Sequence, residues 1–190
     1  MMHLNLFLPN NVWVLCIIFL VSSFVMGEEQ QWLQVIKPFD VKYSYKIRSA
    51  RNFGSIDFIP YNNIKLIATQ PIEACSQKIN NGASIRNNVA HIRRGGCSFV
   101  TKALNAQMYG AVSVVIYDNE LNSKTWIDMI GDGTSRDQLV EIPVYYMKGK
   151  DGHRIHKSVK SSGMIGAVVN LPVNNTNLDI VLDQPPWDYW

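Results

Sequence analysis

The sequence predicts a compact α/β domain with two principal helices. Two strand–helix–strand passages indicate this class, the first over residues 89–119 and the second over residues 142–171. Strands with a clearer alternation of apolar and polar residues precede both passages, and residues 41–47 are the best example. Helices and strands bury their apolar sides against each other, so these patterns favour helices packed on a sheet.

The first passage begins with a short apolar strand that ends at Gly95–Gly96, where the backbone can turn in ways that a side chain would obstruct. Ser98 is a good N-cap for a helix with apolar residues at helical spacing, and Gly110 is a natural C′ residue to end it. Residues 111–117 are almost continuously hydrophobic and β-branched, as expected for a strand buried on both faces. The unit should therefore be a right-handed βαβ crossover.

The remaining strands are expected at residues 31–36, 41–47, 64–68, 142–147 and 164–171. In the second of these strands, odd-numbered residues are apolar or aromatic and even-numbered residues are polar, which predicts one buried and one wet face. Asp151 is expected to cap the second helix, and Gly163 is expected to end it.

Residues 1–27 contain no Asp, Glu, Lys or Arg, and an apolar run from Val12 to Val25 dominates them. This run predicts a secretory signal peptide that is cleaved before Glu28. A retained membrane anchor is the alternative, but the run is shorter than the roughly 20 residues that a spanning helix needs. Both interpretations expose residues 28–190 to an oxidising compartment, and cleavage would leave no stable membrane span.

Residues 28–190 suffice for one ordinary domain of roughly 100–200 residues and leave no room for a second, catalytic domain. The 18 Lys and Arg and the 15 Asp and Glu residues give a net charge of +3, with no long block of one sign. The densest basic spots are Arg93–Arg94 and residues 157–160. Nucleic-acid-binding proteins show broader basic stripes, so these spots are interpreted as solvated surface and a nucleic-acid role is excluded.

Residues 94–99, Arg-Gly-Gly-Cys-Ser-Phe, carry a resemblance to a known family. Together with the helix that ends near Tyr109 and the strand that ends at residues 117–119, they resemble the signature of the protease-associated (PA) domain. Residues 142–144, Ile-Pro-Val, and residues 151–152, Asp-Gly, are similar to the second half of that domain. The order and spacing of several pieces agree, which makes the match more specific than a lone Gly-Gly-Cys.

The resemblance implies a mixed β-sandwich or open barrel flanked by two main helices, with the PA domain at residues 28–172 and a C-terminal extension at 173–190. PA domains accompany proteases, sorting receptors and membrane ubiquitin ligases, where they gate substrate access or bind protein ligands. The whole chain resembles small secreted glycoproteins of animals that contain a single PA domain. The expected function is therefore that of a secreted, non-catalytic module that passes through the endoplasmic reticulum, uses no cofactor and binds a protein partner such as a protease or a receptor.

Three cysteines occur, of which Cys16 leaves with the signal peptide. Cys75 and Cys97 remain as an even pair in an oxidised compartment, which favours one intrachain disulfide. The loop around Cys75 also resembles the loop that carries the partner cysteine in some PA domains. The alternative is a nucleophilic Cys97 at a helix N-terminus, where its pKa would be lowered and where His91 is close in sequence.

Two other functions remain open besides partner binding. A hydrolase would use Ser98 or Cys97 with His91, but the sequence lacks a Gly-x-Ser-x-Gly elbow, a His-Glu-x-x-His helix and paired catalytic carboxylates in context. A purely structural extracellular protein is hard to separate from a binding module. The favoured interpretation is that the protein is not an enzyme.

No metal site is predicted. The five acidic residues within 118–137 match no EF-hand spacing and are interpreted as dispersed surface acids. His153 and His156 stand three apart on the second helix, but two histidines without a third ligand make a weak zinc site. Both are expected to be exposed.

Residues 174–176, Asn-Asn-Thr, form the N-glycosylation sequon, and Asn174 is the predicted glycosylation site. The sequon follows Pro172, where the chain leaves the last predicted strand. Exposure to the glycosylation machinery is expected at such a position.

Four aromatic residues are candidate interaction residues. Trp126 is at the centre of a polar stretch, residues 118–140, which is expected to be a surface loop with one anchored segment. Trp187, Tyr189 and Trp190 near the C-terminus would be an unusual apolar patch if they were free in water. The tail is therefore expected either to fold back onto the domain or to dock on another protein.

Overall fold

A computed structural model describes residues 31–56, 59–174 and 183–188 of the chain. The predicted signal peptide, residues 1–27, lies outside these ranges, as do Tyr189 and Trp190. Within the described ranges, no helix is long and apolar enough to cross a membrane.

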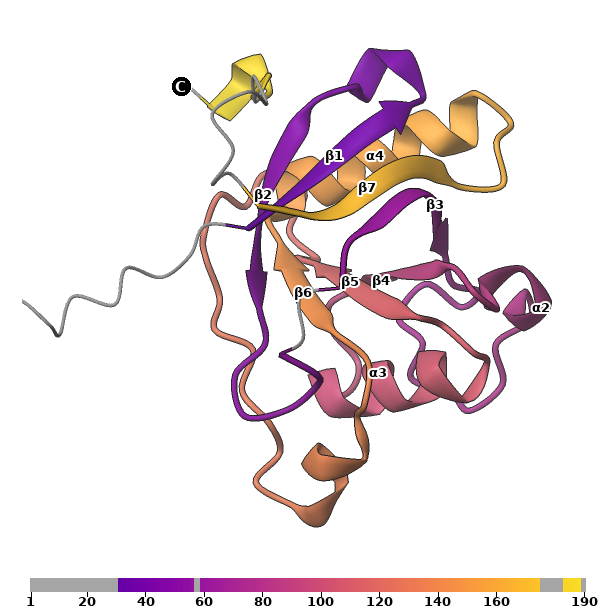
Figure 1. Ribbon diagram of the computed structural model, residues 1–190, viewed down its shortest axis with the longest axis vertical. Coiled ribbons are helices and arrows are strands. Elements are labelled where there is room, and N and C mark those ends of the chain that lie inside the picture. Colours follow the sequence, from indigo (N-terminus) through magenta and orange to yellow (C-terminus); the bar gives the residue numbers. More distant parts are fainter. Residues whose placement is uncertain (1–30, 57–58, 175–182, 189–190) are drawn as a thin grey trace, which may run out of the picture.

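Within the described ranges, seven strands close into a barrel in the order β1-β2-β6-β5-β4-β3-β7 (Figure 1). They are β1 (Gln31–Lys37), β2 (Ser44–Ser49), β3 (Tyr61–Ala68), β4 (Val89–Arg93), β5 (Ser113–Tyr117), β6 (Val144–Met147) and β7 (Ala167–Asn174). β3, β4, β5 and β6 are parallel neighbours, and the other pairings are antiparallel. The predicted α/β class is confirmed, and the sheet is mixed as expected.

The sheet closes completely, where a sandwich or an open barrel was expected. β1 pairs with β7 on one side and with β2 on the other, and β2 pairs with β6. These antiparallel contacts join the two ends of the parallel part of the sheet. Closure removes the unpaired strand edges that an open sheet would present to other chains.

In the described part of the chain, two helices of ten or more residues accompany the barrel, as predicted. They are α3 (Phe99–Met108) and α4 (Gly149–Ser161), and a short helix, α2 (Gly82–Ile85), precedes β4. Among the described residues, short 3-10 helices lie at Phe39–Val41, Ser135–Leu139 and Pro186–Asp188. The four-residue α2 and the turn at 135–139 carry no strong periodic signal, and neither was predicted.

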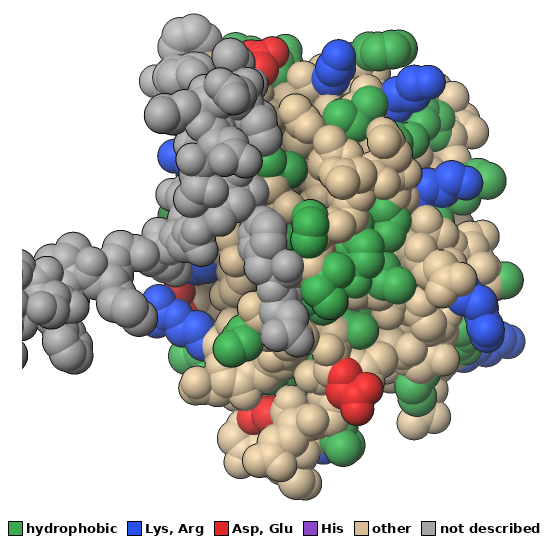
Figure 2. Space-filling model, in the orientation of Figure 1, with side chains coloured by type: hydrophobic (Ala, Val, Ile, Leu, Met, Phe, Trp, Pro, Cys, Tyr) green, Lys and Arg blue, Asp and Glu red, His purple; other side chains and the backbone are tan. Residues whose placement is uncertain are grey.

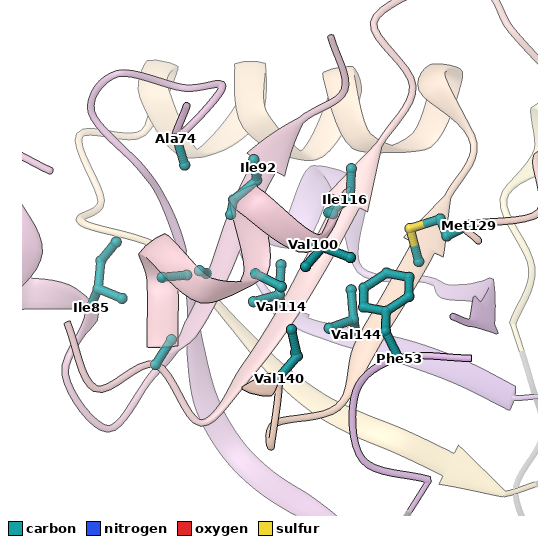
Figure 3. Packing of buried hydrophobic residues seen from close by; sticks show 14 of the residues in the cluster. Phe53, Ala74, Ile85, Ile92, Val100, Val114, Ile116, Met129, Val140 and Val144 are labelled. Atoms are coloured by element: carbon teal, nitrogen blue, oxygen red, sulfur yellow. The ribbon is translucent and has the colours of Figure 1, made fainter. Parts of the chain in front are cut away.

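The core consists of two clusters on the two sides of the parallel strands. Ile92 and Ile116 belong to the cluster that packs against Val100 of α3, which Figure 3 shows from close by. Val115, the neighbour of Ile116 in β5, belongs to the other cluster, which contains Ile155 of α4. All five residues of β5 are buried, so the prediction of a strand covered on both faces is confirmed.

The first passage has the predicted local chemistry. The Ser98 hydroxyl oxygen accepts a hydrogen bond from the Thr101 amide at 3.2 Å, which caps α3. Gly110 has φ of 79° directly after the C-cap residue of α3, a conformation that favours glycine. β4 and β5 are paired in parallel from Val89–Ser113 to Arg93–Tyr117.

The start of α4 differs from the prediction. The helix begins at Gly149, and Asp151 lies buried in its first turn instead of capping it. Gly152 lets α4 approach β5 closely, because a Cβ atom there would come within 2.2 Å of the Tyr117 Cβ. Gly163, with φ of 66°, follows the C-cap residue Ser162, so the predicted end of this helix is confirmed.

Basic side chains are scattered over the face of the molecule that Figure 2 shows. Lys and Arg form separate spots there, with apolar and uncharged polar side chains between them. On that face, the Lys and Arg side chains do not form the broad stripe typical of nucleic-acid-binding proteins.

Candidate interaction surface

The turn after β4, residues 94–98, is the signature turn of the chain. Gly95 and Gly96 have φ of 106° and 80°, which L side chains rarely adopt. Cys97 is bonded to Cys75, with the two Cα atoms 5.6 Å apart. A Cβ atom on Gly96 would lie 3.0 Å from the Cys75 sulfur, so this glycine also gives the disulfide its space.

A buried lysine supports the disulfide from α3. Lys102 has 0% of its surface exposed, and its Nζ donates to the carbonyl oxygens of Glu73 and Gly95, each at 2.6 Å. The same Nζ lies 3.5 Å from the Cys75 sulfur. Burial lowers the pKa of Lys102 to about 8. The loop at residues 73–75 is thus held on α3 by side-chain contacts as well as by the disulfide.

Sequence reasoning missed Lys102. A lysine in an amphipathic helix normally faces water, and only its position beside the buried Ala103 could have hinted otherwise. The carbonyl groups that satisfy it come from the preceding loop and from the signature turn, and no local pattern brings those two segments together.

The structure does not bring together the residues of the alternative hydrolase. The Ser98 hydroxyl caps α3 and donates to Asp132 Oδ2 at 2.8 Å. The Cys97 sulfur is bonded to that of Cys75 and is not a free thiol. His91 is 2% exposed, and its ring packs against Tyr117 with centroids 4.5 Å apart, on the α4 side of the parallel strands. A nucleophile and a base within hydrogen-bond reach of each other are therefore not formed by these three residues.

Three histidines surround the ring of Tyr117. The rings of His153 and His156 on α4 have centroids 5.0 Å and 6.5 Å from that of Tyr117, and His91 and His156 are 6.4 Å apart. His153 and His156 are half-buried, so the expectation that they are exposed is wrong. Among the residues with described positions, no group of three or more His, Cys, Asp or Glu is placed to hold a metal ion.

Two of the five acids within residues 118–137 are buried, which corrects the interpretation that all are surface acids. Asp118 accepts hydrogen bonds from Ser123 Oγ at 2.9 Å and the Tyr146 hydroxyl at 3.0 Å, and it pairs with Arg94 at 3.2 Å. Burial alone would raise the pKa of Asp118, but these hydrogen bonds lower it. Asp137 accepts from the amides of Asp132 and Gly133. Both carboxylates order the long loop between β5 and β6.

Trp126 lies in this loop and is half-buried. Its ring is 6.1 Å from that of Tyr146. Two cations approach it, with the Arg48 guanidinium carbon 4.9 Å and the Lys148 Nζ 5.2 Å from the ring centroid. Asp128 pairs with Arg48 at 2.9 Å, which fixes one of these cations in place.

A hollow of about 610 Å³ lies at the carboxyl ends of β4 and β5. It is lined by Glu73, Cys75, Arg93, Arg94, Gly95, Gly96 and Asn119. Arg93 forms an ion pair with Glu73 across its wall. Asp118 connects this hollow to Trp126, because it bonds both Arg94 and Tyr146. We call the hollow, together with Trp126, Arg48 and Lys148, the carboxyl-end surface.

The other predicted interaction residues have different outcomes. Trp187 packs on its own domain, with its ring 5.5 Å from that of Tyr43 and its Nε1 donating to Asp151. Tyr189 and Trp190 lie outside the described residues, so their role stays a prediction. Asn174 is the last residue of β7, and the rest of the sequon also falls outside them, so glycosylation stays a prediction.

The fold and the surface define a disulfide-bonded α/β barrel module whose signature turn is used for structure. A model of the PA domain family matches residues 64–155. A PRADC1-like protein of Drosophila melanogaster is 32% identical over 163 residues, which cover 84% of this chain and 82% of the fly protein. The chain therefore belongs to the PA domain family.

Longer proteins match over part of their length. The ER degradation-enhancing alpha-mannosidase-like protein 3 of Xenopus laevis is 32% identical over 114 residues, 58% of this chain but 12% of that protein. Among solved structures, a zinc aminopeptidase from Bacillus subtilis has a TM-score of 0.50 at 21% identity, and an aminopeptidase from Aneurinibacillus sp. strain AM-1 has 0.52 at 15%. Each match covers 76% of this chain and 30% of the aminopeptidase, and it shows the fold alone.

Proposed function

We propose that the protein is a secreted, N-glycosylated, non-catalytic module that binds a protein partner through the carboxyl-end surface. Membership of the PA domain family supports a role in protein interaction. The aminopeptidases share only the fold, and this chain spans 30% of their length, so their activity is not proposed for it.

The state of the signature turn is the observation that carries this proposal. Its cysteine is bonded, its serine caps α3, and the nearby histidine is buried on the side of α4. The turn that marks the family thus has a structural use for each reactive group. What it offers to other molecules is the shape and charge of the hollow that it borders.

The carboxyl-end surface has the composition of a protein-binding site. In folds with parallel strands, both open sheets and closed barrels, ligands tend to bind at the carboxyl ends of the strands. Binding energy at interfaces is concentrated in Trp, Tyr and Arg, and Trp126 lies here beside Arg48 with one side already supported by Tyr146. A pre-ordered aromatic side chain loses little conformational entropy when a partner covers it.

The secretory route has separate support. The Cys75–Cys97 disulfide suits an oxidising compartment, and one relative is named for degradation in the ER. N-terminal sequencing of secreted protein checks cleavage before Glu28, and a chain that keeps Met1 would contradict it.

Endoglycosidase digestion checks the glycan on Asn174. A Thr176→Ala variant should migrate in electrophoresis like the digested wild-type protein.

Photo-cross-linking tests the binding surface. A photoreactive phenylalanine analogue in place of Trp126 should give one discrete cross-linked protein in secreting cells, because this side chain faces the partner. The matched control carries the analogue in place of Met108, which is 60% exposed at the end of α3. No product at position 126, or the same products at both positions, would refute binding at the carboxyl-end surface.

A further inference from the structure

Residues 183–188 lie against α4 and the loop before β2, although 36 residues separate Trp187 from its partner Asp151. The Trp187 Nε1 donates to Asp151 Oδ1 at 2.8 Å, and the Arg154 guanidinium lies 4.1 Å from the centre of the indole ring. The ring of Tyr43 meets the indole edge-on at 5.5 Å. The backbone is held as well, because Lys150 Nζ donates to the Trp187 carbonyl oxygen at 3.1 Å.

These contacts form a socket that is specific for an aromatic ring with an N–H donor. Asp151 has 1% of its surface exposed, and in the described part of the chain the side chain that hydrogen-bonds its carboxylate is Trp187. A buried carboxylate without a donor is costly, so the socket favours indole over phenyl. Arg154 adds a cation over the ring, which favours the electron-rich indole further.

A hollow of about 420 Å³ continues from the socket along α4. Lys150, His153, Arg154 and Lys157 of α4 line it, and so does Leu121, which is 61% exposed. The acid in its wall is Asp40, whose Oδ1 accepts a hydrogen bond from Ser158 at 2.5 Å. The hollow is therefore basic with an apolar rim, and it is open next to a tryptophan that already occupies one end.

We propose that the socket and this hollow, together the α4 groove, form a docking site for an acidic, tryptophan-containing segment of a partner protein, and that residues 183–188 occupy part of it in cis. The inference rests on the proposed protein-binding function and adds a second surface with a defined partner chemistry. The tail itself shows which chemistry fits, since its sequence is Asp-Gln-Pro-Pro-Trp-Asp. A partner with more acidic residues beside its tryptophan would also use the basic hollow, which the tail leaves open.

Covalent attachment gives the tail a high effective concentration at the socket. A partner segment must therefore displace it, and the apparent affinity of the intact protein for such a segment is reduced by the fraction of time that the tail is bound. A protein whose tail cannot fill the socket should bind the same segment more tightly.

Fluorescence anisotropy with a labelled peptide of the sequence of residues 183–188 tests this. The full chain carrying Trp187→Ala should bind the peptide at least about tenfold more tightly than the wild type, because its socket is free of the tail indole. The double variant Trp187→Ala, Arg154→Ala should bind the peptide about tenfold more weakly than Trp187→Ala alone. Binding of the peptide to the Trp187→Ala chain should also weaken as the salt concentration rises. The matched control adds Lys160→Ala instead, an exposed α4 residue that does not line the groove, and should leave the affinity unchanged.

Three results of this experiment would overturn the proposal, and a fourth, from the oligomeric state, follows them. They are no binding to the Trp187→Ala chain at about millimolar peptide, equal binding to the wild type and to that chain, or equal losses from Arg154→Ala and Lys160→Ala. A wild-type dimer that the peptide dissociates would identify the occupant as the tail of a second copy, which also contradicts it. Loss of this binding with an intact cross-link at position 126 would refute the α4 groove alone and leave the proposed function standing.

Discussion

Protonation at His91 should lower the free energy of unfolding by about 1 kcal/mol when the pH falls from about 7.5 to about 5.5, and by more as the pH falls further. Burial of the imidazole, together with the nearby His156 and His153, lowers the pKa of His91 from 6.5 to about 3. The buried Nε2 has no hydrogen-bond partner among the described residues, so nothing there offsets the cost of charging the ring.

The sign of this pH effect follows from the pKa of His91 in the unfolded and in the folded protein. The unfolded chain binds a proton at His91 near pH 6.5, whereas the folded protein resists protonation until about pH 3. Acid therefore favours the unfolded chain throughout this window, and the stability that neutral His91 allows is fully present only above it. Asp151 acts in the opposite direction, because burial raises its pKa to about 6 and the folded state gains protons first.

A His91→Leu variant isolates this contribution. Between about pH 7.5 and about pH 5.5, urea unfolding should show a loss of unfolding free energy that is smaller by about 1 kcal/mol in the variant than in the wild type, whatever the variant's absolute stability. The contribution of Asp151 cancels in this comparison, since both proteins contain it. Equal pH dependence in the two proteins would show that His91 titrates normally, which contradicts its burial against Tyr117.

Loss of the Cys75–Cys97 disulfide should cost about 3 kcal/mol of folding free energy. The two cysteines are 22 residues apart, and in the chain-entropy model closing a loop of this length restricts the unfolded chain by that amount. The cost is a large fraction of the roughly 5–15 kcal/mol that stabilises a domain. A Cys75→Ala, Cys97→Ala double variant should nevertheless fold, because Lys102 and Asn105 still hold the carbonyl groups of residues 73–74 on α3.

Equilibrium unfolding of the double variant, with and without a reducing agent, measures this effect. The wild type with reductant should become about as unstable as the variant, and the variant itself should not respond to reductant. A loss below about 1 kcal/mol would mean that the contacts of Lys102 hold the loop without the bond. A variant that cannot fold at all would mean that those contacts depend on it.

The parts of the fold that depend on neighbouring residues were predictable from the sequence. Ser98 and Gly110 mark the two ends of α3 by capping chemistry, and the β-branched run before Tyr117 marks a strand buried on both faces. The disulfide followed from an even pair of cysteines in a chain expected to be secreted.

The parts that depend on distant residues were not predictable. Closure of the barrel requires β1, the first strand in the sequence, to pair with β7, the last strand. No local pattern specifies that register. Burial of Lys102 requires two carbonyl groups from other segments. Asp151 was expected to cap α4 because its type suits that role, but the tail supplies Trp187 as its partner from beyond the barrel.

The most direct test of the central claim is turnover by the purified glycoprotein on peptide, ester and glycoside substrates, measured in parallel with Ser98→Ala. The substitution should cost only about 1 kcal/mol of cap stability, so the variant remains folded and is a fair comparison. A binding module predicts no turnover above the buffer blank in either protein. Turnover by the wild type that disappears in Ser98→Ala, or in His91→Leu, would contradict the account and show that the signature turn carries a catalytic group.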